Sequence, residues 1–135
     1  MILVINTADS EQVFIGLLEK GKWQAKKQFK ARAQQAEKLL PAIQKMFRVS
    51  GFRFQGIKGI AVVSGPASFT ALRIGVVTAN TLAWSLGVPV ISLKLNEFKE
   101  LSSLAKAVTV KLARNKNEVI VRPFYGKKPN ITLKL

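Results

Sequence analysis

The sequence predicts an α/β domain with the element order β-β-β-α-β-α-β. Short apolar runs rich in branched residues, which are typical of buried strands, occupy residues 2–6, 57–64 and 88–93. Two longer stretches with apolar residues at helical spacing, residues 32–49 and 69–86, lie between those runs. Because a helix that connects two strands carries the chain back over the sheet, the later strands are predicted to pair in parallel.

The chain is expected to open with three strands in a meander. Residues 2–6 form the first strand, and residues 12–18 form the second. The second strand ends at a Glu19-Lys20-Gly21-Lys22 turn, whose glycine suits a hairpin. Residues 23–29 then alternate apolar and polar side chains, so the third strand should be half exposed.

The first helix is predicted over residues 32–49, ahead of the fourth strand at residues 57–64. The apolar residues that recur on it at helical spacing are Ala36, Leu39, Leu40, Ile43, Met46 and Phe47. Pro41 falls inside this pattern, so we expect a kink or a local break there. Gly51 is expected to end the helix in the left-handed conformation, which glycine adopts at little cost.

The second helix is predicted over residues 69–86, and the fifth strand follows it at residues 88–93. Its main apolar stripe consists of Phe69, Leu72, Val76, Ala79, Ala83 and Leu86. Ile74, Val77 and Trp84 lie off that stripe. A helix that is apolar on more than one side must be covered on more than one side.

A strip of small side chains also runs along the second helix, because Ala71, Gly75 and Ala79 lie four residues apart. Such a strip lets another helix approach closely. Internal packing against the sheet or the first helix is the alternative. Because the larger apolar stripe already serves that contact, we favour a partner helix at the small strip. Gly75→Leu is then expected to leave the chain folded but to block association.

The rest of the chain is predicted as a third helix over residues 96–104, followed by a hairpin. Residues 107–113 and 118–125 would form the two strands of that hairpin, joined by the basic turn Arg114-Asn115-Lys116-Asn117. A short further strand is expected at residues 131–133, in the basic tail.

The element order up to residue 93 is the plan of one lobe of a ribonuclease H-like or actin-like ATPase fold. The chain is therefore divided into an N-terminal lobe, residues 1–105, and a short β-hairpin with a basic tail, residues 106–135. The family resemblance described below implies that the second part is the remnant of a second lobe, most of which is missing.

Composition excludes several kinds of chemistry. The chain has no cysteine and no histidine, which rules out disulfides, thiol nucleophiles, imidazole metal ligands and histidine acid–base catalysis. Its 22 Lys and Arg residues against 7 Asp and Glu residues give a net charge of +15, which attracts polyanions such as RNA. The longest apolar runs fall short of the roughly 20 residues of a membrane span. The N-terminus lacks a basic leader, so a cytoplasmic location is expected.

Residues that could bind a metal or a phosphate are scarce. The acidic residues are Asp9, Glu11, Glu19, Glu37, Glu97, Glu100 and Glu118, and the first strand ends at Asn6 where a metal-binding carboxylate would stand. Residues 65–70 lead into a helix N-terminus but lack the Walker lysine and the G-x-G-x-x-G spacing. A turn with Ser68 as the helix N-cap accounts for them. We therefore expect no catalytic residue, no metal and no cofactor.

Four segments of the chain match the pattern of a known family. They are Ile2-Leu3-Val4-Ile5-Asn6-Thr7-Ala8, Glu37-Lys38-Leu39-Leu40-Pro41, Ser64-Gly65-Pro66-Ala67-Ser68-Phe69-Thr70-Ala71-Leu72-Arg73-Ile74-Gly75 and Val88-Pro89-Val90-Ile91. These segments resemble the TsaB family, also called YeaZ, over residues 1–96. Asn6 replaces the usual aspartate of that family, Gln35 stands where a histidine is common, and Ala67 and Ala71 replace two glycines.

The resemblance implies a non-catalytic partner subunit of TsaD, the relative that carries metal and nucleotide, in the synthesis of tRNA N6-threonylcarbamoyladenosine beside the anticodon. It implies a heterodimer with TsaD through the helices of the first lobe, TsaE (an ATPase) as a further candidate partner, and tRNA reached through the complex. The predicted interface residues are Leu40, Ile43, Phe47, Ala71, Ile74, Gly75, Thr78, Ala79 and Leu82. A homodimer of the isolated chain stays open. So does a stand-alone RNA-binding domain acting through the basic segments 20–32, 114–116 and 122–134.

Overall fold

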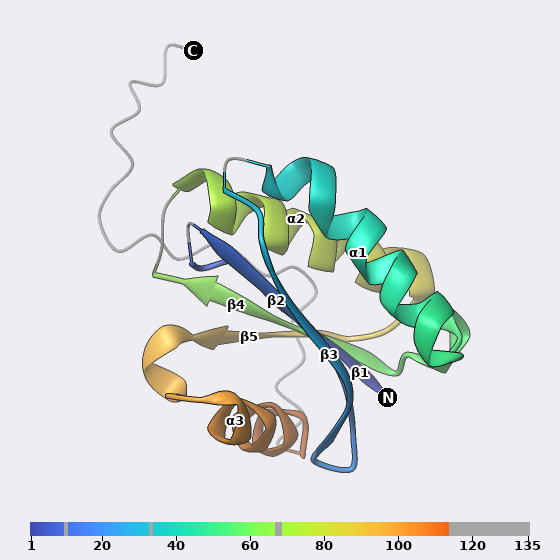
Figure 1. The fold of residues 1–135 in the computed structure, drawn as a ribbon. Helices are drawn as coiled ribbons and strands as arrows, with labels where there is room; N and C mark the ends of the chain where they lie inside the picture. The colour runs from blue at the N-terminus through green and yellow to red at the C-terminus, as the bar shows by residue number, and fades with distance from the viewer. Residues whose placement is uncertain (10, 33, 67–68, 114–135) are drawn as a thin grey trace.

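The computed structural model describes residues 1–9, 11–32, 34–66 and 69–113, which form a five-stranded sheet with helices on both faces (Figure 1). The elements in chain order are β1 (Ile2–Asn6), β2 (Gln12–Glu19), β3 (Lys22–Lys30), α1 (Gln35–Ser50), β4 (Gly59–Gly65), α2 (Phe69–Leu86), β5 (Val90–Lys94) and α3 (Leu101–Ala113). Short 3-10 turns lie at Phe54–Gly56 and Leu95–Glu97. The predicted α/β class and the order β-β-β-α-β-α-β are confirmed.

The strands lie in the order β3-β2-β1-β4-β5. β1 pairs antiparallel with β2 and β2 antiparallel with β3, which is the predicted meander. β1 pairs in parallel with β4, and β4 in parallel with β5, because α1 and α2 carry the chain back between these strands. The interior strand β4 is buried along its whole length, as its continuous apolar run predicts.

Both faces of the sheet are covered, and each has its own core. α1 and α2 pack on one face, with Leu39, Ile43 and Phe47 of α1 and Val76, Ala79 and Ala83 of α2 in the core. α3 packs on the opposite face through Leu104, Ala105 and Val108. α1 contacts β2 and β3, whereas α2 contacts β1, β4 and β5. No helix in the described part of the chain is long and apolar enough to cross a membrane.

The edge strand β3 and its turn follow the sequence pattern closely. Side chains along β3 alternate between exposed and partly buried. Ala25 and Phe29 pack on the core beneath α1, whereas Trp23, beyond a register shift in the β2–β3 pairing, packs on the α3 side. The turn from β2 places Lys20 and Gly21 at φ of 51° and 76°, the left-handed region that glycine tolerates best. At the end of β2, Glu19 accepts a hydrogen bond from the ammonium group of Met1 at 2.9 Å, which lowers the pKa of Glu19.

Helix α1 begins three residues later than predicted and continues through Pro41 without a break. Pro41 has no N–H to give to the carbonyl of Glu37, but both residues are exposed, so water can reach that carbonyl. The helix ends as expected at Gly51, which has φ of 78° and donates its N–H to the carbonyl of Phe47 at 3.0 Å.

The third helix differs from its prediction. Residues 107–113 were predicted as a strand, and this prediction is wrong because they belong to α3. The alternation of Val108, Val110 and Leu112 is strand-like, yet Val108 is buried on the sheet while Val110 is exposed. The proposed division at residue 105 falls inside this helix. The predicted strands at 118–125 and 131–133 lie outside the described residues.

Helix α3 is held against the sheet by an aromatic contact and a lysine. The indole Nε1 of Trp23 donates to the carbonyl of Leu101 at 3.2 Å, and the Trp23 ring meets Phe14 edge to face at 5.3 Å between centroids. Gly16 lies beneath this ring, where an added Cβ would come within 2.6 Å of it. Near the other end of α3, Lys111 donates to the carbonyl of Ser92 at 2.6 Å.

Trp23→Ala should lower the free energy of unfolding by roughly 1–3 kcal/mol, because it removes a half-buried ring together with its hydrogen bond. Urea denaturation followed by circular dichroism measures this loss. Trp84→Ala is the matched control, since Trp84 is 86% exposed and its removal should change stability by less than about 0.5 kcal/mol. Equal losses in the two variants would contradict the role assigned to Trp23.

Candidate partner-binding surface

The outer face of α2 carries apolar side chains that the other described residues leave largely exposed. Val77 is 56% exposed and Trp84 is 86% exposed, while Ile74 beside them is half-buried. These residues lie on one face because positions three, seven and ten residues apart fall close together around a helix. Such a row of large exposed apolar side chains is a feature of surfaces that bind another protein.

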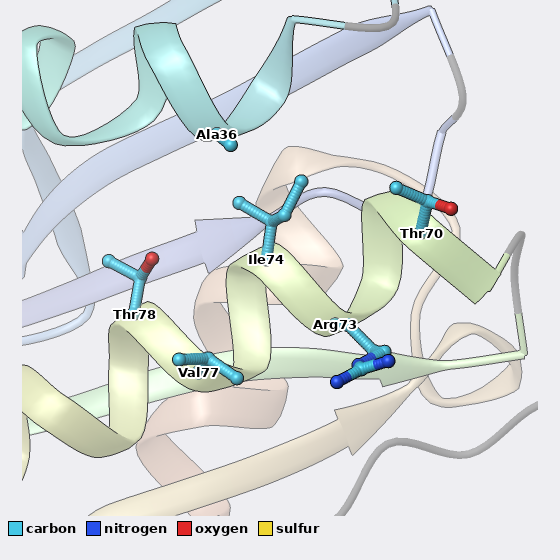
Figure 2. A pocket seen from close by; sticks show the side chains of 6 residues that line it. All are labelled: Ala36, Thr70, Arg73, Ile74, Val77 and Thr78. Atoms are coloured by element: carbon cyan, nitrogen blue, oxygen red, sulfur yellow. The ribbon is translucent and has the colours of Figure 1, made fainter.

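A groove of about 440 Å³ runs beside this row, between α1 and α2 (Figure 2). Its lining residues are Ala36 of α1 and Thr70, Arg73, Ile74, Val77 and Thr78 of α2. Ile74 points toward α1, where Ala36 lies, so the groove has an apolar wall. The hydroxyl groups of Thr70 and Thr78 and the guanidinium of Arg73 add polar groups. The groove can therefore take an apolar side chain from a partner and hydrogen-bond the backbone around it.

The strip of small residues does not contribute to this outer face, and its interpretation as a free helix-docking strip is wrong. Ala71, Gly75 and Ala79 are all buried within the chain. They lie on the half of α2 that packs on the sheet, together with the larger stripe that includes Leu72 and Val76. The alternative, internal packing, is what the structure shows.

Thr7, directly after β1, packs against the part of the small strip that Ala71 and Gly75 form. Its hydroxyl donates to the carbonyl of Ala71 at 2.7 Å in a buried hydrogen bond. A Cβ added to Gly75 would overlap Oγ1 of Thr7 and lie 3.0 Å from its Cγ2. A glycine at position 75 therefore lets the first turns of α2 approach the end of β1. The expectation that Gly75→Leu leaves the fold intact is accordingly wrong.

The other predicted interface residues divide into two groups. Ile43 and Phe47 are buried in the core between α1 and the sheet, so they are not available to a partner. Leu40 is 43% exposed on α1, and Thr78 and Leu82 are half-buried on α2. Val77 and Trp84 were left out of the predicted interface, although their positions off the main apolar stripe were the signal that could have placed them there.

The end of β1, where related folds would place catalytic carboxylates, forms local turns. Asn6 Oδ1 accepts a hydrogen bond from the backbone N–H of Ala8 at 2.9 Å. Asp9 Oδ1 accepts from the N–H groups of Glu11 at 2.8 Å and Gln12 at 3.3 Å. These are the bonds expected of short polar side chains in a loop. Within residues 1–9, 11–32, 34–66 and 69–113, no three Asp, Glu, His or Cys side chains gather where they could hold a metal ion.

The turn between β4 and α2 lies only partly within the described residues. Gly65 ends β4 at φ of 117°, a conformation that L side chains rarely adopt. The predicted N-cap, Ser68, lies outside the described residues. No phosphate-binding role is assigned to this turn.

Comparison with known proteins places the chain among proteins of one tRNA modification. The family model described as "TsaD: tRNA N6-adenosine threonylcarbamoyltransferase" matches residues 29–115, more than half of the chain. A Bacillus subtilis (strain 168) protein named tRNA threonylcarbamoyladenosine biosynthesis protein TsaB is 41% identical over 51 residues, which are 38% of this chain and 22% of the relative. The tRNA N6-adenosine threonylcarbamoyltransferase of Vesicomyosocius okutanii subsp. Calyptogena okutanii (strain HA) is 42% identical over 53 residues, 39% of this chain and 16% of the relative.

The fold points to the same proteins. YeaZ from Pseudomonas aeruginosa superimposes with a TM-score of 0.64 and 26% sequence identity, over 69% of this chain and 43% of that one. The chain thus spans less than half of the solved relative and about a fifth of the curated ones. The predicted ribonuclease H-like or actin-like lobe is confirmed by this similarity.

Proposed function

Because this chain belongs to the TsaD family and to its TsaB (YeaZ) branch, we propose that it is a non-catalytic partner subunit of TsaD in the synthesis of tRNA N6-threonylcarbamoyladenosine. In this role it would bind TsaD through α2 and the adjoining groove, and it would act in the cytoplasm on tRNA held by the complex. TsaE remains a candidate for a further subunit.

The absence of histidine and cysteine from the sequence supports the non-catalytic part of the proposal. The chain has no histidine or cysteine to act as acid, base or nucleophile near neutral pH. Asn6 and Asp9, at the end of β1, are occupied in local turns. A subunit of this kind can contribute to a reaction by holding its partner in the active conformation.

The proposed binding to TsaD rests mainly on the exposed row of Ile74, Val77 and Trp84 beside the groove. In the isolated chain these apolar side chains are exposed to water, which is unfavourable. A partner that covers them removes this apolar surface from water, and the association gains free energy as a result. Tryptophan is among the residues that most often dominate the affinity of an interface. Thr78 and Leu82, which were predicted as interface residues, are half-buried on the same helix.

Co-purification with TsaD from the same cell, analysed by light scattering, tests the proposal. We expect a one-to-one complex with the unmodified chain and none with Val77→Asp, because the carboxylate would be desolvated in the interface. Val110→Asp is the matched control, since Val110 is also exposed on a helix, but on the opposite face of the sheet. If TsaD elutes separately from the unmodified chain, the proposal is wrong.

The same measurement addresses a homodimer. A second copy of the chain could cover the row on α2 when TsaD is absent, and Val77→Asp would then convert a dimer into a monomer. A homodimer that excludes TsaD even at an excess of TsaD would contradict the heterodimer, whereas a homodimer that TsaD displaces would support it.

A further inference from the structure

A second groove lies on the other flank of α1, between that helix and the edge strand β3. It has a volume of about 360 Å³. Its lining residues are Lys27, Phe29 and Lys30 of β3 and Glu37, Lys38, Pro41, Ala42 and Lys45 of α1. On α1, positions 38, 41 and 45 fall on one face because they lie three and seven residues apart. The two elements therefore place two lysines each around one hollow.

The groove carries an excess of unpaired positive charge. Four lysines against one glutamate give its lining a net charge of +3. Within the described residues no carboxylate lies at ion-pair distance from any of these four lysines, and the two ion pairs found there involve Glu19 and Glu97. Glu37 lies in the first turn of α1, where a negative charge favours the helix dipole. Positive charges gathered in this way attract a negatively charged ligand.

The floor of the groove is apolar. Phe29 is half-buried and packs against the core, and Pro41 and Ala42 continue this surface on α1. Lysine stems can lie along such a floor while the ammonium groups stay in water. A positively charged groove that follows the phosphate chain is a feature of proteins that bind single-stranded nucleic acid, and the part of Phe29 that is not buried adds apolar surface to this one.

We propose that this groove, lined by Lys27, Lys30, Lys38 and Lys45, binds the phosphodiester backbone of RNA. RNA is chosen among polyanions because of the proposed function. The groove does not depend on that function, since it follows from the positions of β3 and α1 in the fold. α1 lies between this groove and α2, because α1 covers β2 and β3 while α2 covers β1, β4 and β5. A partner on the outer face of α2 would leave the groove open, so protein and RNA can bind together.

Binding of an unmodified tRNA transcript to the full chain, measured by fluorescence anisotropy over a range of salt concentrations, tests this inference. In the groove variant Lys27, Lys30, Lys38 and Lys45 are each replaced by Gln. We expect the affinity at about 0.15 M salt to fall tenfold or more, and the slope of log K against log salt to decrease by about 3, since each lost phosphate contact removes somewhat less than one unit. All four lysines are at least partly exposed, so the fold should be retained, as a thermal melt will verify.

The matched control replaces Lys22, Lys58, Lys99 and Lys106, which are exposed elsewhere, by Gln. It lowers the net charge by the same four units, and it should retain most of the affinity. Equal weakening in both variants would overturn the groove and leave only non-specific attraction by the overall charge. Displacement of the RNA by polyglutamate of equal charge and concentration would overturn RNA as the ligand.

Measuring TsaD association in the groove variant separates this inference from the proposed function. Normal association with TsaD and loss of tRNA binding are the expected results. Binding of tRNA by the unmodified chain without any association with TsaD would refute the proposed function and leave the groove standing. Association with TsaD together with unchanged tRNA binding by the groove variant would refute the groove alone.

Discussion

Gly75→Ala should lower the free energy of unfolding by about 1–3 kcal/mol, which is a large fraction of the stability of a domain of this size. The added methyl group would overlap Oγ1 of Thr7 and crowd its Cγ2. Thr7 cannot simply turn aside, because it is buried and its hydroxyl is bonded to the carbonyl of Ala71. Urea denaturation measures the loss, and Gly75→Leu should prevent folding altogether.

A double-mutant cycle with Thr7→Ala identifies the cause. Thr7→Ala alone should cost about 1–2 kcal/mol through the lost hydrogen bond and methyl group. It also removes the two atoms that a methyl at position 75 would meet first. The double variant should therefore be more stable, by at least about 1 kcal/mol, than the sum of the two single losses predicts.

The control for this cycle is Gly56→Ala. An added Cβ at Gly56 would meet no other atom within 4 Å, and the backbone there has no positive φ. Its stability should change by less than about 0.5 kcal/mol. Strict additivity between positions 7 and 75 would show that the contact between β1 and α2 does not limit the residue at 75.

Local pattern was sufficient to predict most of the fold. β1 and α2 have the predicted bounds. The sequence of β1 is a run of branched apolar residues that ends at a polar one, and such a run fits a buried strand. The sequence of α2 has apolar residues at helical spacing up to a glycine, and such a pattern fits a long helix. The β2–β3 hairpin follows from its turn and from the alternation along β3. Where two periodicities fit the same residues, as at 107–113, the contact with the sheet decided the outcome in favour of a helix.

The candidate surface was harder to predict because it depends on contacts distant in sequence. The large apolar stripe of α2 was predicted to pack inside the domain, but the sequence did not show that the small strip packs there as well. That packing involves Thr7, which contacts Ala71 and Gly75, and the hydrogen bond to Ala71 joins residues 64 positions apart. The basic groove has the same origin, since the lysines of β3 and α1 share a hollow only when the sheet has formed.

Trp84→Ala should weaken association with TsaD by about 2 kcal/mol or more, which is about 30-fold in Kd, while leaving the isolated chain as stable as before. Trp84 is almost fully exposed, so its large apolar surface contributes little to folding and is available to a partner. Trp84→Phe keeps an aromatic ring and should retain part of the affinity. Titration calorimetry of TsaD with each variant gives the three constants.

Tryptophan fluorescence provides an independent measurement of the same interface. The chain has two tryptophans, and Trp23 is already held between Phe14 and the start of α3. Burial of Trp84 by TsaD should shift the emission to shorter wavelength, and Trp84→Ala should abolish this shift. Val110→Ala, on the opposite face of the sheet, should change neither the shift nor the affinity. If Trp84→Ala binds TsaD as tightly as the unmodified chain does, α2 is not the interface, and TsaD must contact another surface of this domain.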